Sequence, residues 1–221
     1  MEGETWIGIS FAKEYRLMIA FMIDSTESSL CEPLVAETEG RLAQGSWPVW
    51  VSDGMDSYGD ALKKRHCILK TYPRTGRRGR PRRPKLVACP EVRYGQVVKQ
   101  RDERHRIIAV VKQSVYGEVP LKTISTVYIE RHNLTLRHEN RRLTRKTIAF
   151  SKRNEGLRSQ MTMYQSYYNL VRAHRGLKVR ISDQHNRLRA WQYRTPAVAA
   201  GITDHIWSLK ELMTTKIYIN H

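Results

Sequence analysis

The sequence is poor in cysteine and in acidic residues, and it has no long apolar run. Its three cysteines, Cys31, Cys67 and Cys89, are odd in number and widely spaced, so we expect neither a disulfide framework nor a CxxC zinc site, and a reducing compartment. No apolar run approaches the roughly 20 residues that cross a bilayer, and the first residues lack the basic and apolar segments of a secretory leader. We therefore expect a cytoplasmic protein that does not span a membrane.

Histidine offers no clear metal site in place of cysteine. His66 lies beside Cys67, and His132 precedes His138, but neither spacing is typical of a tetrahedral zinc site. We expect ordinary surface side chains at these positions and no zinc.

The charge that is present is mainly positive. The 221 residues include 39 Lys and Arg against 21 Asp and Glu, which gives a net charge of +18 and an isoelectric point near 10.1. Such an excess predicts a polyanionic partner, with nucleic acid first and an anionic membrane surface second. Most of the basic residues are arginines, whose planar guanidinium groups favour binding to phosphate.

Apolar and β-branched runs predict strands that alternate with helices. The first two runs are separated by three residues and predict a hairpin, and the second, almost wholly apolar, is typical of a central strand buried on both faces. The expected strands are Thr5–Phe11, Tyr15–Ile23, Pro48–Ser52, Tyr94–Gln100 and Arg106–Gln113, and the expected helices in this part are Glu27–Gln44 and Met55–Lys64.

One acid, Asp53, comes directly after a short buried strand and before Gly54. The carboxyl end of a buried strand is where α/β folds place functional groups, and the glycine lets the backbone turn. The alternative is that Asp53 only caps the following helix, since Asp is a favoured N-cap residue.

A tract rich in Pro, Gly and Arg, Tyr72–Lys85, cannot contribute to a core, so we expect an exposed and mobile loop. Its centre, Arg78-Gly79-Arg80-Pro81, resembles the short AT-hook pattern that lays arginines in a narrow minor groove. The alternative is a basic linker that contacts only phosphates.

The stretch Thr126–Lys152 predicts one long helix in which Glu130 is set among basic residues. At 100° per residue, Glu130, Arg137 and Arg141 would lie on one face, and an apolar stripe formed by Ile129, Leu136 and Leu143 would dock on a core. The alternative is a solvated charged face without a function.

The segment after this stretch predicts further helices. A helix over about Leu157–His174 carries a stripe of Met and aromatic side chains, which is typical of a core and less often of a platform that stacks nucleobases. Val179–Arg194 is polar and expected to be irregular, and Thr203-Asp204 is expected to cap a last short helix that contains Trp207.

Four phrases resemble, in order, the compact DDE transposases of bacterial and archaeal insertion sequences. They are WVSDGMDSYGDALKK (50–64), IERHNLTLRHENRRLTRKTIAFSK (129–152), YNLVRAHRGL (168–177) and RTPAVAAGITDHIWSLKELM (194–213). The resemblance implies an α/β, ribonuclease H-like core with a central mixed sheet flanked by helices, here over residues 1–155, and a helical C-terminal extension over 156–221.

The resemblance also implies the chemistry of a transposase, namely metal-dependent DNA cleavage and strand transfer. Asp53 would be the second and Glu130 the third of three acids that hold two Mg²⁺ or Mn²⁺ ions. DNA, as transposon ends and target, would be the partner, and the protein would be associated with the nucleoid. The basic residues that would contact DNA are Arg78, Arg80, Arg137, Arg141, Arg142, Arg145 and Lys146.

The chain departs from the family pattern because it has no match for the first of the three acids. In the family that acid lies on an opening strand, upstream of the strand that corresponds to Thr5-Trp6, and no residue of this sequence matches it. We therefore expect a shortened, inactive copy that still binds DNA, with an exposed sheet edge that favours association into homodimers. Two alternatives are a start codon further upstream and a non-enzymatic basic nucleic-acid-binding protein that regulates transposition.

Overall fold

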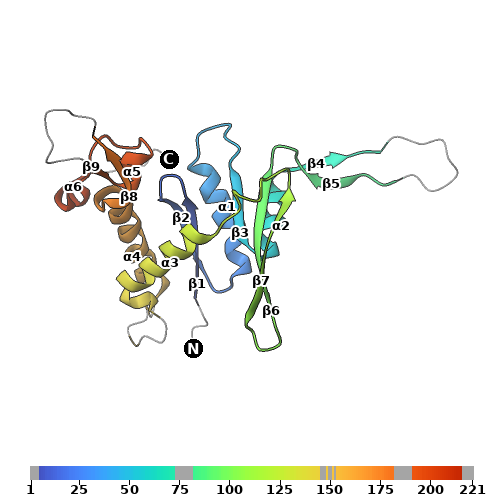
Figure 1. Cartoon of the computed structure of the whole chain (residues 1–221), viewed down its shortest axis with the longest axis horizontal. Helices are drawn as coiled ribbons and strands as arrows, with labels where there is room; N and C mark the ends of the chain where they lie inside the picture. Colours follow the sequence, from blue (N-terminus) through green and yellow to red (C-terminus); the bar gives the residue numbers. More distant parts are fainter. Residues whose placement is uncertain are drawn as a thin grey trace. The chain divides into compact units, whose positions relative to one another are not determined.

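The computed structural model describes residues 5–72, 82–144, 148, 151, 153–181 and 191–215. It is an α/β structure with several helices and a mixed three-stranded sheet (Figure 1). The chain divides into two compact units, which we describe separately: unit 1 is Met1–Trp6 and Asp24–Val127, and unit 2 is Ile7–Ile23 and Tyr128–His221. The expected boundary at residue 155 stays a prediction. Within the described ranges, no helix is long and apolar enough to cross a membrane.

Unit 1 is built around a three-stranded sheet in the order β3-β6-β7. β3 runs parallel to β6, and β6 runs antiparallel to β7. Its elements are η1 (Ser28–Leu30), α1 (Cys31–Gly40), β3 (Val49–Asp53), α2 (Asp56–Arg65), β4 (Cys67–Lys70), β5 (Lys85–Ala88), β6 (Arg93–Arg101) and β7 (Ile107–Tyr116). The expected strands over 48–52, 94–100 and 106–113 are therefore confirmed, with small shifts at their ends.

The two faces of β6 are buried by different partners, as the period-2 alternation of a strand requires. Tyr94 is in the cluster that joins α1 and α2, and Val97 is in a second cluster with Val119 and Ile124. Gly95 faces this second cluster so closely that a Cβ atom there would lie 2.6 Å from Ile124 Cδ1. A glycine is therefore required where Ile124 covers the sheet.

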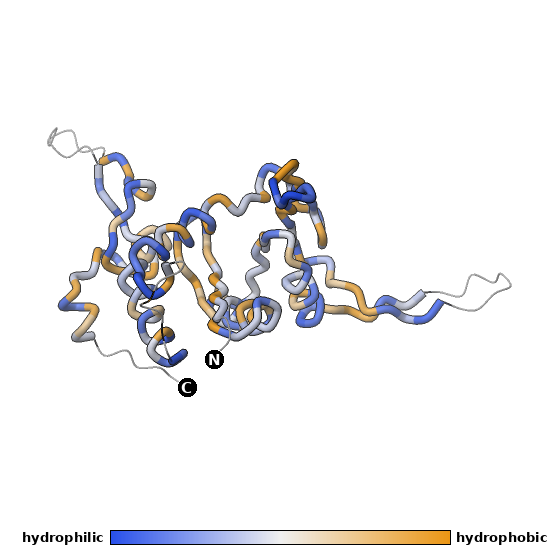
Figure 2. The backbone as a smooth tube through the Cα atoms, turned by 90° about the horizontal axis from the view of Figure 1, so that it is seen from below, coloured by the Kyte–Doolittle hydropathy of each residue, from blue (hydrophilic) through white to orange (hydrophobic). Residues whose placement is uncertain are grey.

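Unit 1 also contains a short antiparallel ribbon, in which β4 pairs with β5. The sequence patterns did not predict it, and Lys85, expected in a loop, is its first β5 residue. Ile68, Leu69 and Leu86 are exposed, and Figure 2 shows apolar residues along the part of the ribbon that adjoins the rest of unit 1. Both strands are only four residues long and mostly exposed, so the sequence has no alternation of apolar and polar residues that would indicate them.

Unit 2 begins with the expected hairpin, although its second strand is not central. The two-stranded sheet β1–β2 consists of β1 (Trp6–Ala12) and β2 (Leu17–Asp24). Side-chain amides take the place of a third strand at Met18: Asn169 Oδ1 accepts from Met18 N at 3.1 Å, and Asn169 Nδ2 and Gln165 Nε2 each donate to Met18 O at 2.9 Å. The expectation of a strand buried between two others is therefore wrong, because helix side chains bond to the backbone at this point.

Three helical segments pack on this hairpin. They are α3 (Val127–Glu139), α4 (Asn154–Ser166) and the π-helical turn η3 (Tyr167–Val171), with a 3₁₀ turn η2 (Arg141–Leu143) after α3. Met161, Tyr164 and Tyr168 are buried, which confirms that most of the Met and aromatic stripe is core. His132 is also buried, at 3% exposure, so the expectation of a surface histidine is wrong there. It lies on the same face of α3 as Leu136 and meets the rings of Phe11 and Tyr168.

The end of the chain is less helical than expected. β8 (His174–Arg180) and β9 (Trp191–Arg194) form a two-stranded sheet, so residues 179–180 and 191–194 of the segment expected to be irregular are strand residues. Two short helices follow, α5 (Pro196–Ala199) and α6 (Leu209–Thr214). The last helix is capped by Ser208 through a capping box with Glu211, so the expected cap at Thr203-Asp204 is also wrong.

Candidate nucleic-acid and metal-binding residues

Asp53 is the last residue of β3, and it is exposed. It pairs in register with Val97 of the parallel strand β6. α2 begins only at Asp56, its N-cap residue is Met55, and no side chain caps it. The alternative that Asp53 caps the helix is therefore wrong, and its carboxylate remains at the carboxyl end of a parallel strand, where functional groups are often found.

A chain of hydrogen bonds fixes the backbone at Asp53. Ser52 Oγ donates to the Asp53 carbonyl at 2.7 Å, so the Tyr94 hydroxyl, 2.6 Å away, must donate to Ser52 Oγ. Gln96 Nε2 donates to the Tyr94 hydroxyl at 3.0 Å, and Gln113 Nε2 donates to Gln96 Oε1 at 3.0 Å. Burial raises the pKa of Tyr94, which keeps this hydroxyl protonated.

This network was not predicted from the sequence. Ser52 adjoins the strand-end acid, but Gln96 and Gln113 carry no local signal of a role. Gln96 also donates to the Met55 carbonyl at 3.2 Å, so one side chain holds the turn that follows Asp53. The network therefore holds the backbone both at Asp53, through Ser52, and two residues later at Met55, through Gln96.

Glu130 lies in the first turn of α3 and is exposed. An acid in the first turn is stabilised by the positive end of the helix dipole. His132 and Leu136 form the buried face of the same helix, which leaves Glu130 and Arg137 on exposed positions. The exposed position of Glu130 fits the sequence prediction, and its role stays a prediction.

The long helix expected over Thr126–Lys152 ends early, at Glu139. Asn140 has an extended backbone, and its side chain accepts from Arg142 N at 3.1 Å and from Gln160 Nε2 at 2.8 Å. An asparagine that bonds to its own following backbone competes with helix continuation. Arg141 and Leu143 therefore lie in η2, and the expected face that joins Glu130, Arg137 and Arg141 on one helix is wrong.

The basic residues expected to contact DNA fall into two groups. Arg137, Arg141 and Arg142 are exposed, and Arg142 Nη1 also donates to Ser151 Oγ at 3.0 Å. Their exposure leaves them accessible to phosphate. Arg78, Arg80, Arg145 and Lys146 lie outside the described residues.

The ribbon β4–β5 carries further positive charge on unit 1. Lys70 and Arg82 lie over the ring of Tyr72, at 5.9 Å and 5.6 Å from its centroid. Lys85 opens β5 and pairs in register with Lys70. Unit 1 thus presents cations and one aromatic ring beside the expected basic loop.

The donor chemistry of Asp53 and Glu130 suits a hard divalent cation, because both are exposed carboxylates. Asp53 belongs to unit 1 and Glu130 to unit 2. Over the described ranges, the structure contains no group of three or more His, Cys, Asp or Glu side chains that could hold a metal ion. Each carboxylate is thus of the ligand type that hard divalent cations prefer, but the described residues do not form a metal site.

Comparison with known proteins finds a family match over part of this chain. The family model of the IS1 transposase matches residues 96–167. This segment runs from within β6 to the first residue of η3 and includes Glu130, whereas Asp53 lies before it. No curated protein and no solved structure matches the chain. The match supports a transposase role, and it identifies residues 96–167 as related to the DDE transposases of insertion sequences. This agrees with the phrase at 129–152, which lies inside the match, whereas the other three phrases lie outside it.

Proposed function

We propose that the chain is a transposase of an insertion sequence that binds DNA chiefly through its phosphates, on a ribonuclease H-like core. The observation that carries this proposal is the match of residues 96–167 to the IS1 transposase, a segment that contains the exposed Glu130 and the exposed Arg137, Arg141 and Arg142. The mixed parallel and antiparallel sheet of unit 1, with α1 and α2 packed together on it, is compatible with such a core.

DNA is the partner that best accounts for the charge. A net charge of +18 on 221 residues attracts a polyanion, and exposed arginines pair with phosphate oxygens in a two-pronged geometry. We propose that Arg78, Arg80, Arg145 and Lys146 act together with Arg137, Arg141 and Arg142. Transposon ends and target DNA are the proposed ligands, bound with little dependence on sequence at these positions.

We further propose that Asp53 and Glu130 each supply a carboxylate ligand for Mg²⁺ or Mn²⁺. A bound divalent ion would activate an attacking oxygen or stabilise a leaving oxygen of the phosphodiester. The protein's own contribution is to hold these carboxylates: the Ser52–Tyr94–Gln96 hydrogen bonds fix the backbone at Asp53, and the first turn of α3 carries Glu130.

DNA binding is tested by measuring the affinity for a duplex at increasing salt concentrations. We expect the logarithm of the affinity to fall linearly with the logarithm of the salt concentration, with a slope of roughly 0.9 per phosphate contact, so several contacts give a steep line. Replacing Arg137, Arg141 and Arg142 by alanine should reduce this slope. A flat salt response, or no binding at low salt, contradicts the proposal.

The metal role is tested with Asp53→Asn and Glu130→Gln, which remove a charge and keep the side-chain shape. Both variants should weaken Mn²⁺ binding while leaving DNA affinity equal or slightly higher. Glu103→Gln and Glu155→Gln are matched controls, since they remove exposed acids from a turn of unit 1 and from the first turn of α4. Equal Mn²⁺ binding in all four variants would instead favour a non-enzymatic nucleic-acid-binding protein.

A further inference from the structure

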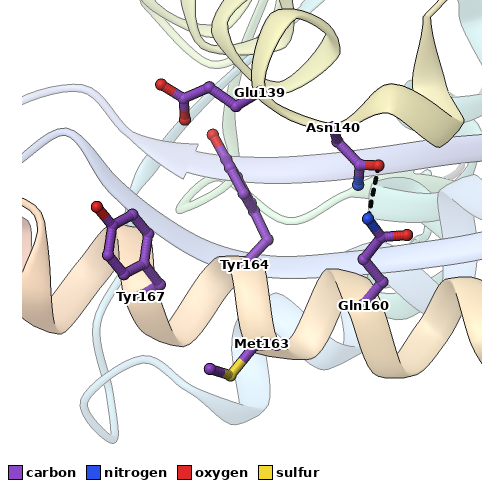
Figure 3. Close-up of a pocket in the computed structure, with 6 residues that line it drawn as sticks. All are labelled: Glu139, Asn140, Gln160, Met163, Tyr164 and Tyr167. Atoms are coloured by element: carbon purple, nitrogen blue, oxygen red, sulfur yellow. Dashed lines mark hydrogen bonds between the residues drawn. The ribbon is translucent and has the colours of Figure 1, made fainter. Parts of the chain in front are cut away.

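The small pocket beside α4 is closed at its polar atoms. It has a volume of about 230 Å³, and Figure 3 shows Gln160 and Tyr164 of α4 facing Glu139 and Asn140. Three atoms here have no hydrogen-bond partner among the described residues, namely Asn140 Nδ2, Gln160 Oε1 and the Tyr164 hydroxyl, and all three are buried beneath the surface. A ligand in the pocket cannot contact them, and the surface that lacks a partner lies in unit 1 instead.

This surface is the outer edge of β7. The sheet of unit 1 has the order β3-β6-β7, and among the described residues no strand pairs with the side of β7 that faces away from β6. Alternate residues of such an outer strand direct backbone N–H and C=O groups away from the sheet. β7 has ten residues, against about five or six in a usual strand, so it presents a long row of these groups.

The side chains of β7 are mainly apolar and exposed. They include Ile107 (50% exposed), Ile108 (66%), Val110 (55%), Val111 (38%) and Val115 (38%). β3 pairs with β6 only as far as Val97, whereas residues 107–111 of β7 pair with residues 98–101 of β6. This part of the hairpin is therefore a two-stranded ribbon, which is marginally stable by itself, and a further strand would stabilise it.

The charge of β7 distinguishes it from the rest of this basic chain. Lys112 is the one charged residue among its ten, although the whole chain has a net charge of +18. β7 therefore offers little to DNA phosphates, and it is a place where two copies of the chain can meet with little repulsion. The ribbon β4–β5 also exposes apolar side chains, but its Lys70 and Lys85 pair in register, which makes it a poorer contact for a second copy.

The apolar part of β7 is complementary to itself. Residues 107–111 are Ile-Ile-Ala-Val-Val, with one alanine between two pairs of β-branched residues. In an antiparallel pair of identical strands, a two-fold axis at Ala109 puts the two small alanines opposite each other. Ile107 then lies opposite Val111 of the other copy, and Ile108 likewise lies opposite Val110. All these pairs are apolar, and β-branched pairs across two strands stabilise a sheet.

We propose that β7 pairs antiparallel with β7 of a second copy of this chain, so that two three-stranded sheets become one continuous sheet. At each end of the apolar pairs, Lys112 would lie opposite Arg106 of the other copy. Asp102 limits the repulsion there, because its Oδ2 atom accepts from Arg106 Nε at 2.8 Å. The sequence predicted association through the hairpin β1–β2, but most residues of that hairpin are half-buried, and β7 is the more exposed edge.

The test measures the mass of the DNA-free chain by analytical ultracentrifugation over a wide range of concentrations. The wild type should pass from monomer to dimer, and Ile108→Lys should raise the dissociation constant at least about tenfold, because it replaces a buried apolar pair by a charge on the edge. Ile202→Lys is the matched control, since it replaces an isoleucine that is 65% exposed in unit 2. Added salt should leave the dimer unchanged or strengthen it, whereas it weakens DNA binding.

The inference is independent of the proposed DNA binding, and its outcomes are separate. A wild type that stays monomeric at all concentrations, or that forms open-ended oligomers, overturns the pairing of β7 and leaves DNA binding intact. Equal effects of Ile108→Lys and Ile202→Lys place the contact elsewhere and also overturn it. If Ile108→Lys loses the folded circular dichroism spectrum, hydrogen exchange of the wild type decides. Alternate amides of β7 should be more protected in concentrated than in dilute protein, and equal protection contradicts the pairing.

Discussion

Acidification should destabilise unit 2 through the buried His132 and the half-buried His174. Burial lowers the pKa of His132 to about 4, helped by the nearby charges of His174 and Arg172. Burial also lowers the pKa of His174 to about 4, and Arg172 and Arg16 add to the effect. The folded pKa values lie below the ordinary value of 6.5, so the unfolded chain binds more protons between pH 6.5 and 4. Stability is therefore full above pH 6.5 and falls as the pH drops toward 4.

The size of the loss follows from the shift of His132. A shift of the pKa by about 2.5 at roughly 1.4 kcal/mol for each pKa unit corresponds to about 3–4 kcal/mol. His174 adds little to this figure, because it is partly exposed and its charge is already one cause of the His132 shift. Hydrogen bonds lower the pKa values of three carboxylates, Asp24, Asp102 and Asp204, below the ordinary value of 3.8. Their contribution to stability is therefore lost only at a pH below the range in which the histidines take up protons.

Urea unfolding followed by circular dichroism at pH 7, 6, 5 and 4 measures this loss. His132→Leu should flatten the dependence on pH over this range, because an apolar side chain takes up no proton in the same apolar surroundings. His138→Leu, on the exposed side of the same helix, should keep the wild-type dependence. The same loss of stability in His132→Leu and in the wild type would refute the reasoning.

Two further substitutions test contacts inside each unit, one in unit 1 and one in unit 2. Gly95→Ala should lower the free energy of unfolding by about 1–3 kcal/mol, since its Cβ would lie 2.8 Å from Cγ1 of the fully buried Ile124. Gly40→Ala, where a Cβ meets nothing within 4 Å, is the control, and equal effects in urea unfolding would contradict the clash. Asn169→Leu should cost about 1–3 kcal/mol, because Met18 N loses its partner at 3.1 Å. Hydrogen exchange at the Met18 amide should then become faster, and unchanged protection would show that this bond has no role.

The sequence predicted those elements that consist of a continuous run of apolar or β-branched residues. The strand before Asp53 and the strands β6 and β7 follow from runs of β-branched residues, and the hairpin β1–β2 follows from its two apolar runs. The position of Asp53 at a strand end could be predicted for the same reason. Its role as a ligand stays a prediction, as does that of Glu130.

The remaining features depend on partners that are distant in the sequence. α3 ends at Glu139 because Asn140 bonds to Arg142 N and to Gln160, which lies 20 residues further on. Tyr94 lies 42 residues from Ser52, so the network beneath Asp53 exists only once β3 and β6 are paired. The pocket likewise requires two helices to meet, and neither helix alone carries a pattern that indicates it.

The amide bonds at Met18 also have a consequence for synthesis on the ribosome. Asn169 lies 151 residues after Met18 in the chain. At the usual 5–20 residues per second, the hairpin would wait about 8–30 s before Asn169 is even translated. During that interval the Met18 backbone lacks its final hydrogen-bond partners, so a ribosome-associated chaperone that covers the nascent hairpin would protect an unpaired strand.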